Sequence, residues 1–299
     1  MPLSVQVQCP AKVNLFLEVT GKRRDGYHLL ATLFAKIGVF DVLDVERTDA
    51  RGFSLEVVDE ANQGLGAGPD NLVLLAAEAF RKEFRLGYGA RIVLTKRIPL
   101  GAGLGGGSSD AAGMLQALAR LHNLETDRAA MARIRRLAPA LGADVPFFMR
   151  REGICDGRGV GDKLKPLLAP KHLPWMVLVY PGMPVPTAEV YKRLVPPARS
   201  VVLTSLSQLD RLKKRLTAGR PSEDWTGLLF NRLEDAVLER RPEVRQAKEI
   251  LARAGLTGVL MSGSGASVFG FAASREEGEK VARRLKCYPW KVYLTCCLG

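Results

Sequence analysis

The chain has 299 residues, of which 47% are hydrophobic and 25% are charged, close to the average for soluble globular domains. This composition excludes an intrinsically disordered chain, and the length predicts two domains, which we place at residues 1–162 and 163–299. The net charge of +13 suits nucleic acid, an anionic membrane surface or a phosphorylated small molecule.

The sequence also allows expectations about the protein's location, its cysteines and its partners. It contains no uncharged apolar run of membrane-spanning length and no N-terminal signal pattern, so we expect a cytoplasmic protein without a membrane partner. The five cysteines lack metal or redox spacing and are expected to be free thiols. Because the basic residues are scattered without interleaved aromatic residues, we expect no nucleic-acid partner, and we expect a monomer or a weak homodimer.

The first half is predicted to open with strands and then to alternate helices and strands. β-branched and apolar runs predict strands over residues 4–8, 13–19, 30–34, 41–46 and 90–96. Helical spacing of apolar residues predicts helices over residues 71–84, 108–121 and 128–141. The second of these helices follows a loop over residues 99–107 and is predicted to be capped by Ser108, Ser109 or Asp110.

The second half has a different rhythm, and the domain boundary is expected between residues 162 and 173. Strands are predicted over residues 176–180, 256–261, 267–271 and 290–295, and helices over residues 187–194 and 275–285. The resulting β-α-β-β-α-β order is typical of ferredoxin-like domains, with extra helices inserted between residues 203 and 254. We therefore expect an α+β protein.

The most informative segment is Pro99-Leu-Gly-Ala-Gly-Leu-Gly-Gly-Gly-Ser-Ser109, which we call the glycine loop. Five of the seven residues from 101 to 107 are glycines, so backbone N–H groups are exposed just where a helix begins. Such N–H groups can surround an anion, and the helix N-terminus adds its positive field. The loop therefore predicts a phosphate site, the alternative being a flexible linker or a tight turn.

Other phosphate loops fit the sequence poorly. The dinucleotide fingerprint requires an acidic residue at the end of a strand about 20 residues later, but a polar segment between two predicted helices occupies that place. The Gly-Lys-Ser/Thr ending of a P-loop and the motifs of protein kinases are also absent from the sequence.

Three segments together resemble the motifs of the GHMP kinase superfamily: Pro10-Ala-Lys-Val-Asn-Leu15, the glycine loop and Met261-Ser-Gly-Ser-Gly-Ala266. Within it, Gly21-Lys-Arg-Arg-Asp-Gly-Tyr-His28, Gly68-Pro-Asp-Asn-Leu-Val73 and Leu141-Gly-Ala-Asp-Val-Pro-Phe-Phe148 resemble the family of 4-diphosphocytidyl-2-C-methyl-D-erythritol kinases of the non-mevalonate isoprenoid pathway. The match covers nearly the whole chain. It implies an N-terminal S5-like α/β domain and a C-terminal ferredoxin-like domain.

Two residues are predicted to carry the chemistry. Asp144 follows a predicted helix and precedes apolar residues, so its carboxylate could accept a proton from an attacking hydroxyl, and Lys12, in an otherwise apolar strand, could stabilise the charge. The resemblance implies the same two roles. Taken alone, Asp144 could be a turn former and Lys12 a surface lysine.

The resemblance also implies the ligand-binding residues. Tyr27 and His28 could clamp a planar base, and the family holds cytosine at the equivalent positions. ATP is expected to contact Asn71, Lys96 and the loop residues Pro99, Leu100, Gly101, Ala102, Gly103, Leu104, Gly105, Gly106, Gly107, Ser108 and Ser109. The cytidyl substrate is expected to contact Asn14, Tyr27, His28, Thr187, Tyr191, Gly263 and Ser264. Asn71 alone could equally be a helix N-cap.

One position departs from the family pattern. Asp110 stands where this family usually carries Asn, and a carboxylate there would repel phosphates unless Mg²⁺ or a basic side chain compensates its charge. Asp110 and Ser108 are therefore the candidate metal ligands. The expected function is Mg²⁺-dependent transfer of phosphate from ATP to the cytidyl substrate; the alternatives are a homoserine or mevalonate type of kinase, a non-catalytic ATP sensor and an RNA-binding module.

Overall fold

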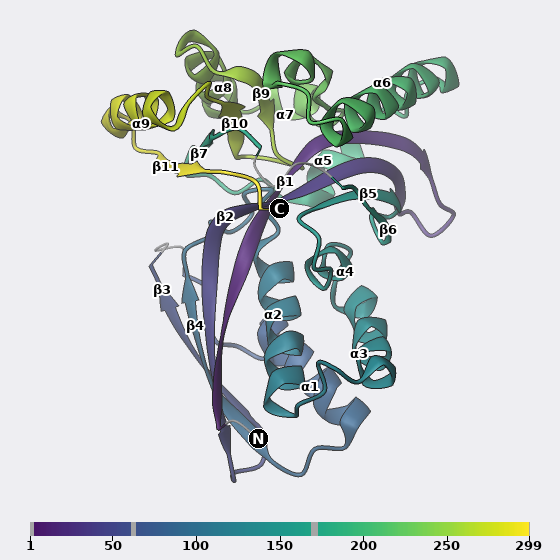
Figure 1. Cartoon of the computed structure of the whole chain (residues 1–299), viewed down its shortest axis with the longest axis vertical. Helices are drawn as coiled ribbons and strands as arrows, with labels where there is room; N and C mark the ends of the chain where they lie inside the picture. The colour runs from purple at the N-terminus through teal and green to yellow at the C-terminus, as the bar shows by residue number, and fades with distance from the viewer. Residues whose placement is uncertain (1–2, 61–63, 169–172, 299) are drawn as a thin grey trace. The chain divides into compact units, whose positions relative to one another are not determined.

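The computed structural model describes residues 3–60, 64–168 and 173–298, which form two compact units, each built from several segments of the chain. Unit 1 consists of Met1–Ala11, Val39–Leu100 and Gly105–Arg151, and unit 2 of Lys12–Gly38, Gly101–Leu104 and Glu152–Gly299. Two long strands, β1 (Ser4–Lys22) and β2 (His28–Thr48), contribute residues to both units (Figure 1). The division at residue 162 stays a prediction about domains.

The described residues of unit 1 form strands and four helices. β4 (Gly89–Lys96) pairs antiparallel with β2, from Val42 opposite Thr95 to Thr48 opposite Gly89, and parallel with β3 (Phe53–Asp59). The helices are α1 (Leu72–Phe84), α2 (Gly106–Leu121), α3 (Arg128–Leu141) and the single turn α4 (Val145–Phe148). This mixed arrangement confirms the expected α/β character of the N-terminal part.

Helix α2 is the central helix of unit 1, because twelve of its sixteen residues are buried. Small residues allow the close packing: a Cβ added to Gly113 would lie 2.3 Å from the Sγ of Cys9 on β1. α2 therefore presents its N-terminus, which the glycine loop enters, from a rigidly packed position.

Unit 2 contains a four-stranded antiparallel sheet in the order β11-β7-β10-β9, made of β7 (Met176–Tyr180), β9 (Thr257–Met261), β10 (Val268–Phe271) and β11 (Lys291–Thr295). This is the order of a ferredoxin-like sheet. α8 (Pro242–Arg253) contacts β9 and β10, and α9 (Arg275–Arg284) contacts β7 and β11 (Figure 1). The ferredoxin-like prediction is confirmed.

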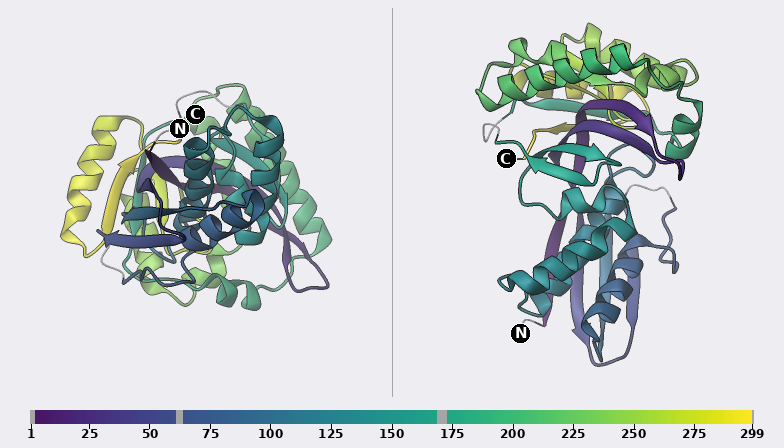
Figure 2. Two further views of the ribbon diagram at one scale, coloured as in Figure 1. Left: turned by 90° about the horizontal axis from the view of Figure 1, so that it is seen from below. Right: turned by 90° about the vertical axis from the view of Figure 1, so that its right-hand side faces the viewer.

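The remaining elements of unit 2 extend this core. β5 (Ile154–Gly159) pairs with β2 and with β6 (Lys163–Pro166), and the two-residue β8 (Phe230–Asn231) runs parallel to β1. α6 (Arg199–Thr217) and α7 (Glu234–Leu238) match the extra helices expected from the sequence (Figure 2). α5 (Thr187–Arg193) matches the helix predicted over residues 187–194, but α8, not α5, packs on β9 and β10.

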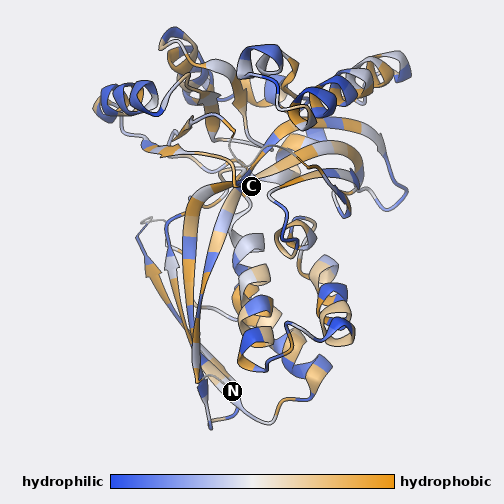
Figure 3. Cartoon of the chain, in the orientation of Figure 1, coloured by the Kyte–Doolittle hydropathy of each residue, from blue (hydrophilic) through white to orange (hydrophobic). Residues whose placement is uncertain are grey.

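Hydropathy follows this arrangement (Figure 3). Apolar residues predominate along the middle of β1 and in β7, whose five residues are all buried, whereas α9 is hydrophilic over most of its length and buries only Gly278 and Val281. None of the helices described is both long enough and apolar enough to cross a membrane.

Several strand predictions were wrong. Residues 4–8 and 13–19 belong to one strand, β1, which continues through Pro10, and residues 30–34 and 41–46 belong to one strand, β2. β3, β5, β6 and β8 were not predicted, although the burial of β3 alternates. α2 begins at Gly106 after Gly105, whose φ of 70° places the N-cap in the left-handed region, so no side-chain hydroxyl caps this helix.

Candidate active site

In the glycine loop the backbone carbonyl groups of residues 101–105 have hydrogen-bond partners within the protein, whereas the backbone N–H groups of residues 101–108 find no acceptor among the described residues. Each carbonyl from residue 101 to residue 105 accepts a hydrogen bond from the protein. The donors are, in order, Val185 N (3.0 Å), Ser267 N (3.1 Å), the side chains of Lys12 and Ser262 (2.8 and 3.0 Å), Lys12 N (2.9 Å) and Ser109 N (2.9 Å). Within the part of the chain that the structure describes, no acceptor contacts the N–H groups of residues 101–108. The donors are thus left for an anion.

Left-handed glycines create this pattern. Gly101, Gly103 and Gly105 have φ values of 59°, 74° and 70°, a region that other residues rarely occupy. At Gly103 the space is also closed, since an added Cβ would lie 2.1 Å from the carbonyl oxygen of Ser262. The glycines are therefore required both for the backbone conformation and for the close approach of residues 261–266.

Lys12 lies at the centre of this part of unit 2. Its side chain is only 4% exposed, and its ammonium group donates to Asn14 Oδ1 and to the Gly103 carbonyl, each at 2.8 Å. Asn14 donates in turn to Thr32 Oγ1 at 2.8 Å, and Thr32 donates to the Phe16 carbonyl at 2.7 Å. Because Lys12 and Asn14 are two residues apart on β1, both side chains point to the same face of the strand.

The serine-glycine segment of residues 261–266 lies against Lys12. Gly263 has a φ of 55°, and an added Cβ would come within 3.1 Å of Lys12 Nζ and 3.3 Å of Asn14 Oδ1. The hydroxyl groups of Ser264 and Thr187 share a hydrogen bond of 2.8 Å. The predicted residues Lys12, Asn14, Thr187, Gly263 and Ser264 are thus brought together within unit 2.

The aromatic residues pair differently from the predicted clamp. The ring of His28 stacks on Tyr191, with centroids 5.0 Å apart and planes inclined by 29°, whereas Tyr27 is 63% exposed. Burial and the charge of Lys22 lower the pKa of His28, so the imidazole is neutral near pH 7. The role of Tyr27 stays a prediction.

Unit 1 holds three further predicted residues: Ser108 in α2, Asp144 before α4 and Asn71 before α1. Ser108 is half-buried, and a Cβ added to Gly142, two residues before Asp144, would lie 3.5 Å from its hydroxyl. Asp144 is half-buried as expected and precedes α4. Asn71 caps α1 by accepting a hydrogen bond from Val73 N at 3.0 Å, and it donates to the Gly66 carbonyl at 3.2 Å. The partnership of Asp144 with Lys12 stays a prediction.

Lys96 lies inside unit 1 with two carboxylates. It is 1% exposed and forms ion pairs with Asp41 and, at 2.7 Å, with Asp110, and its ammonium lies 2.9 Å from the position of a Cβ on Gly106. Burial would lower the pKa of Lys96, but the two carboxylates outweigh it and raise that pKa. Burial raises the pKa of Asp110 to about 7, against the opposing effect of Lys96. Asp41 also accepts hydrogen bonds from the N–H groups of Arg97 and Ile98.

A basic side chain therefore compensates the unexpected charge of Asp110. Asp110 fits poorly as a metal ligand, because it is 2% exposed and one carboxylate oxygen is bound by an ammonium group. Among the described residues, no group of three or more His, Cys, Asp and Glu side chains could hold a metal ion. Ser108, with a partly accessible hydroxyl, is the better-placed candidate to contact a metal that arrives with phosphates.

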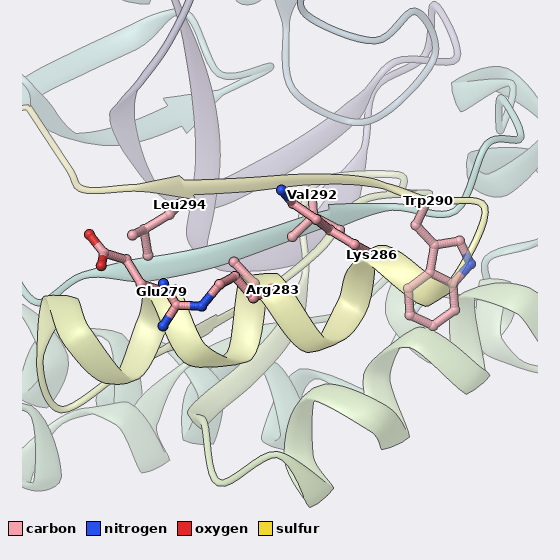
Figure 4. A pocket seen from close by; sticks show the side chains of 7 residues that line it. Glu279, Arg283, Lys286, Trp290, Val292 and Leu294 are labelled. Atoms are coloured by element: carbon pink, nitrogen blue, oxygen red, sulfur yellow. The ribbon is translucent and has the colours of Figure 1, made fainter.

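A surface pocket of about 420 Å³ lies between α9 and β11 (Figure 4). It is lined by Glu279, Ala282, Arg283, Lys286, Trp290, Val292 and Leu294, none of which the sequence predicted as functional. Glu279 is paired with Arg275 at 2.9 Å. The pocket offers neither a glycine loop nor a buried lysine, so the candidate active site remains at the glycine loop.

Comparison with known proteins decides the family. Residues 71–152 match the model for the GHMP kinases N-terminal domain, and residues 206–291 match that for the GHMP kinases C-terminal region. A 4-diphosphocytidyl-2-C-methyl-D-erythritol kinase from Chlorobaculum tepidum is 38% identical over 281 residues, covering 93% of each chain. The chain belongs to this kinase family. One from Thermus thermophilus is 39% identical over 283 residues, covering 93% of this chain and 92% of its own.

Solved structures of kinases agree with this assignment. A crystal structure of 4-(cytidine 5'-diphospho)-2C-methyl-D-erythritol kinase superposes with a TM-score of 0.80 at 35% identity, covering 99% of this chain and 100% of its own. Homoserine kinase from Cytophaga hutchinsonii superposes with a TM-score of 0.78 at 19% identity, covering 100% and 96%, and shares the fold. The protein is thus a GHMP kinase, a phosphotransferase that uses ATP.

Proposed function

We propose that the protein transfers the γ-phosphoryl group of ATP to the 2-hydroxyl of 4-diphosphocytidyl-2-C-methyl-D-erythritol, the compound after which its relatives are named. One observation carries this proposal: the carbonyls of residues 101–105 are bound by the protein, the N–H groups of residues 101–108 have no acceptor among the described residues, and the buried Lys12 ammonium binds the Gly103 carbonyl. Free donors next to a fixed cation suit a triphosphate.

The proposed reaction needs a base and a stabilised transition state. Asp144 accepts the proton of the substrate hydroxyl as its oxygen attacks the γ-phosphorus, and the bond from phosphorus to the β,γ-bridging oxygen breaks, with ADP as the leaving group. Lys12 stabilises the negative charge on the attacking oxygen and the phosphoryl group. No covalent enzyme intermediate is required.

The loop residues 99–109 hold the phosphates in this proposal, and Asn71 holds the adenine at the start of α1. Lys96 supports the loop and does not bind the phosphates directly, because its ammonium group is paired with the carboxylates of Asp41 and Asp110. The Ser108 hydroxyl is the protein group that would contact Mg²⁺ bound to the nucleotide, and the metal would neutralise charge on the phosphates.

The acceptor binds to unit 2. Asn14, Thr187, Gly263 and Ser264 contact its polar groups, and Tyr27, His28 and Tyr191 recognise the cytosine ring. A neutral His28 can both donate and accept a hydrogen bond, which suits a pyrimidine edge. We further propose that the enzyme works in the cytoplasm as a monomer or a weak homodimer.

The proposal is tested by measuring ADP release from ATP and Mg²⁺ with 4-diphosphocytidyl-2-C-methyl-D-erythritol, mevalonate, homoserine or no acceptor. We expect turnover with the cytidyl acceptor alone, competition by CDP, and loss of turnover in Asp144→Asn. Turnover with mevalonate or homoserine would contradict the proposed substrate, and ATP binding without any turnover would contradict the proposed activity.

A further inference from the structure

Asn231, a buried residue of β8, belongs to no step of the proposed reaction. Its amide nitrogen donates to the carbonyls of Met261 (2.8 Å) and Gly263 (2.7 Å), and its Oδ1 accepts from Leu233 N (3.0 Å). One carboxamide thus ties down two carbonyls of the serine-glycine segment of residues 261–266. We propose that Asn231 is a positioning residue that fixes this segment against the strand carrying Lys12.

The position of Asn231 is set by β1 itself. In the parallel pairing of β8 with β1, Phe16 lies opposite Phe230 and Leu17 opposite Asn231. The next residue, Arg232, donates its N–H to the Leu17 carbonyl at 2.8 Å. Residues 230–232 are therefore hydrogen-bonded to the same strand that presents Lys12 a few residues earlier.

A partly buried ion pair strengthens this attachment. The guanidinium of Arg232 forms two hydrogen bonds, of 2.8 and 2.7 Å, with the carboxylate of Glu18, which is fully buried on β1. The same guanidinium lies over the ring of Phe230 at 4.7 Å. A bidentate pair of this kind fixes orientation as well as distance.

Glu234 completes the support from the same short segment. Its Oε1 accepts a hydrogen bond from Met261 N at 2.8 Å, and its other oxygen is paired with Lys248. Both backbone polar groups of Met261 are thus bound by side chains from residues 231–234. The start of the serine-glycine segment has little freedom to move while these contacts persist.

The segment that Asn231 holds determines what surrounds Lys12. Gly263 lies against the Lys12 ammonium, and the Ser262 hydroxyl donates at 3.0 Å to the Gly103 carbonyl that Lys12 also binds. If the Gly263 carbonyl lost its donor, the segment would shift, and Lys12 and the loop would shift with it. A displacement of about 1 Å at such a site can reduce catalysis on the order of 100-fold.

This inference rests on the proposed function for its kinetic consequence. A residue needed only for stability would lower the melting temperature and leave kcat of the folded enzyme unchanged. A positioning residue would lower kcat and raise KM for the acceptor, which the segment contacts, more than KM for ATP.

The test compares Asn231→Asp with wild type and with the matched control Gln208→Ala. Gln208 also donates a side-chain amide hydrogen bond to a main-chain carbonyl, that of Leu228, but it lies away from the serine-glycine segment. In Asn231→Asp a carboxylate faces two carbonyl oxygens, so we expect kcat to fall by roughly 10- to 100-fold. Because a protonated carboxyl can donate one hydrogen bond, activity relative to wild type should recover partly from about pH 8 to about pH 6. Gln208→Ala should retain kcat at a comparable loss of melting temperature.

Asn231→Ala decides the question if the Asp variant does not fold, and hydrogen–deuterium exchange of residues 261–267 makes the outcome independent of the acceptor. We expect faster exchange of the Ser262, Gly265 and Ser267 amides than in Gln208→Ala. Unchanged exchange together with wild-type kcat would overturn the inference. If wild type turned over no acceptor, the proposed function would fail, and the exchange comparison alone would still decide for or against Asn231.

Discussion

Two buried lysines contact the glycine loop, and they are held in different ways. Lys96 lies between the carboxylates of Asp41 and Asp110, whereas Lys12 donates to the amide oxygen of Asn14 and the carbonyl of Gly103. The two carboxylates balance the charge of the Lys96 ammonium, so we expect Lys96 to support the loop from within unit 1. Lys12 binds the carbonyl of Gly103, whose own N–H has no acceptor among the described residues, and we therefore propose that Lys12 acts on the substrate.

The largest effect is expected for Lys12→Met, which should lower kcat by about 1,000-fold, since a preorganised charge is lost from the transition state. Steady-state kinetics gives kcat, and a thermal melt establishes that the variant is folded. A variant with nearly normal kcat would remove the distinction between the two lysines.

Gly103→Ala should follow, with kcat/KM for ATP reduced by roughly 100-fold. The added Cβ would meet the Ser262 carbonyl oxygen at 2.1 Å in a backbone region with a φ of 74° that alanine avoids. Titration with ATP measures the loss of nucleotide affinity. The matched control is Gly68→Ala, because an added Cβ at Gly68 meets no atom within 4 Å. Unchanged ATP binding by Gly103→Ala would contradict the prediction and show that the loop adapts to the added methyl group.

Lys96→Met should act mainly on stability. Two buried carboxylates would lose their shared cation, which costs about 3–5 kcal/mol in the free energy of unfolding. Chemical denaturation gives this value, and the double variant Lys96→Met with Asp110→Asn should recover part of it. If instead Lys96→Met unfolded like wild type but lost ATP turnover, Lys96 would act directly on the nucleotide.

Asp110→Asn should have the smallest effect, visible in the pH dependence of stability. The folded-state pKa of Asp110 is raised from 3.8 to about 7, chiefly by burial, so the folded state binds its proton more tightly than the unfolded state. The stability contributed by this group is therefore fully present below pH 3.8 and lost as pH rises toward 7.

Melting curves between these pH values should show a smaller decline for Asp110→Asn than for wild type. The variant should keep the wild-type Mg²⁺ requirement, because Lys96 compensates the carboxylate. A changed Mg²⁺ requirement would reinstate Asp110 as a metal ligand.

The sequence predicted local features best where side chains alone determine them. α3 was predicted with its observed bounds of Arg128 and Leu141, because Asp127 caps it and the apolar spacing is regular. The start of α2 was misplaced because glycines weaken a helix signal, although here they continue directly into the helix. The alternation in Phe53–Asp59 was a usable signal for β3.

The residues of the candidate site could likewise be predicted only where a local sequence motif marks them. Lys12 and Gly263 could be chosen from motifs, but Asp41 and Asn231 carry no local signal, since their roles come from partners far away in the sequence. Asp41 pairs with Lys96, 55 residues later, and Asn231 donates to the Gly263 carbonyl, 32 residues later. Only the fold brings these groups together, so sequence patterns identified the loop and missed much of what holds it.

The most direct test of the central claim is ³¹P NMR of the enzyme with ATP, Mg²⁺ and 4-diphosphocytidyl-2-C-methyl-D-erythritol. We predict the signals of ADP together with one new phosphomonoester signal, while the diphosphate of the acceptor stays intact. Inorganic phosphate in place of the phosphomonoester, or an unchanged ATP spectrum, would contradict the assignment of this glycine loop and Lys12 to phosphoryl transfer onto that acceptor.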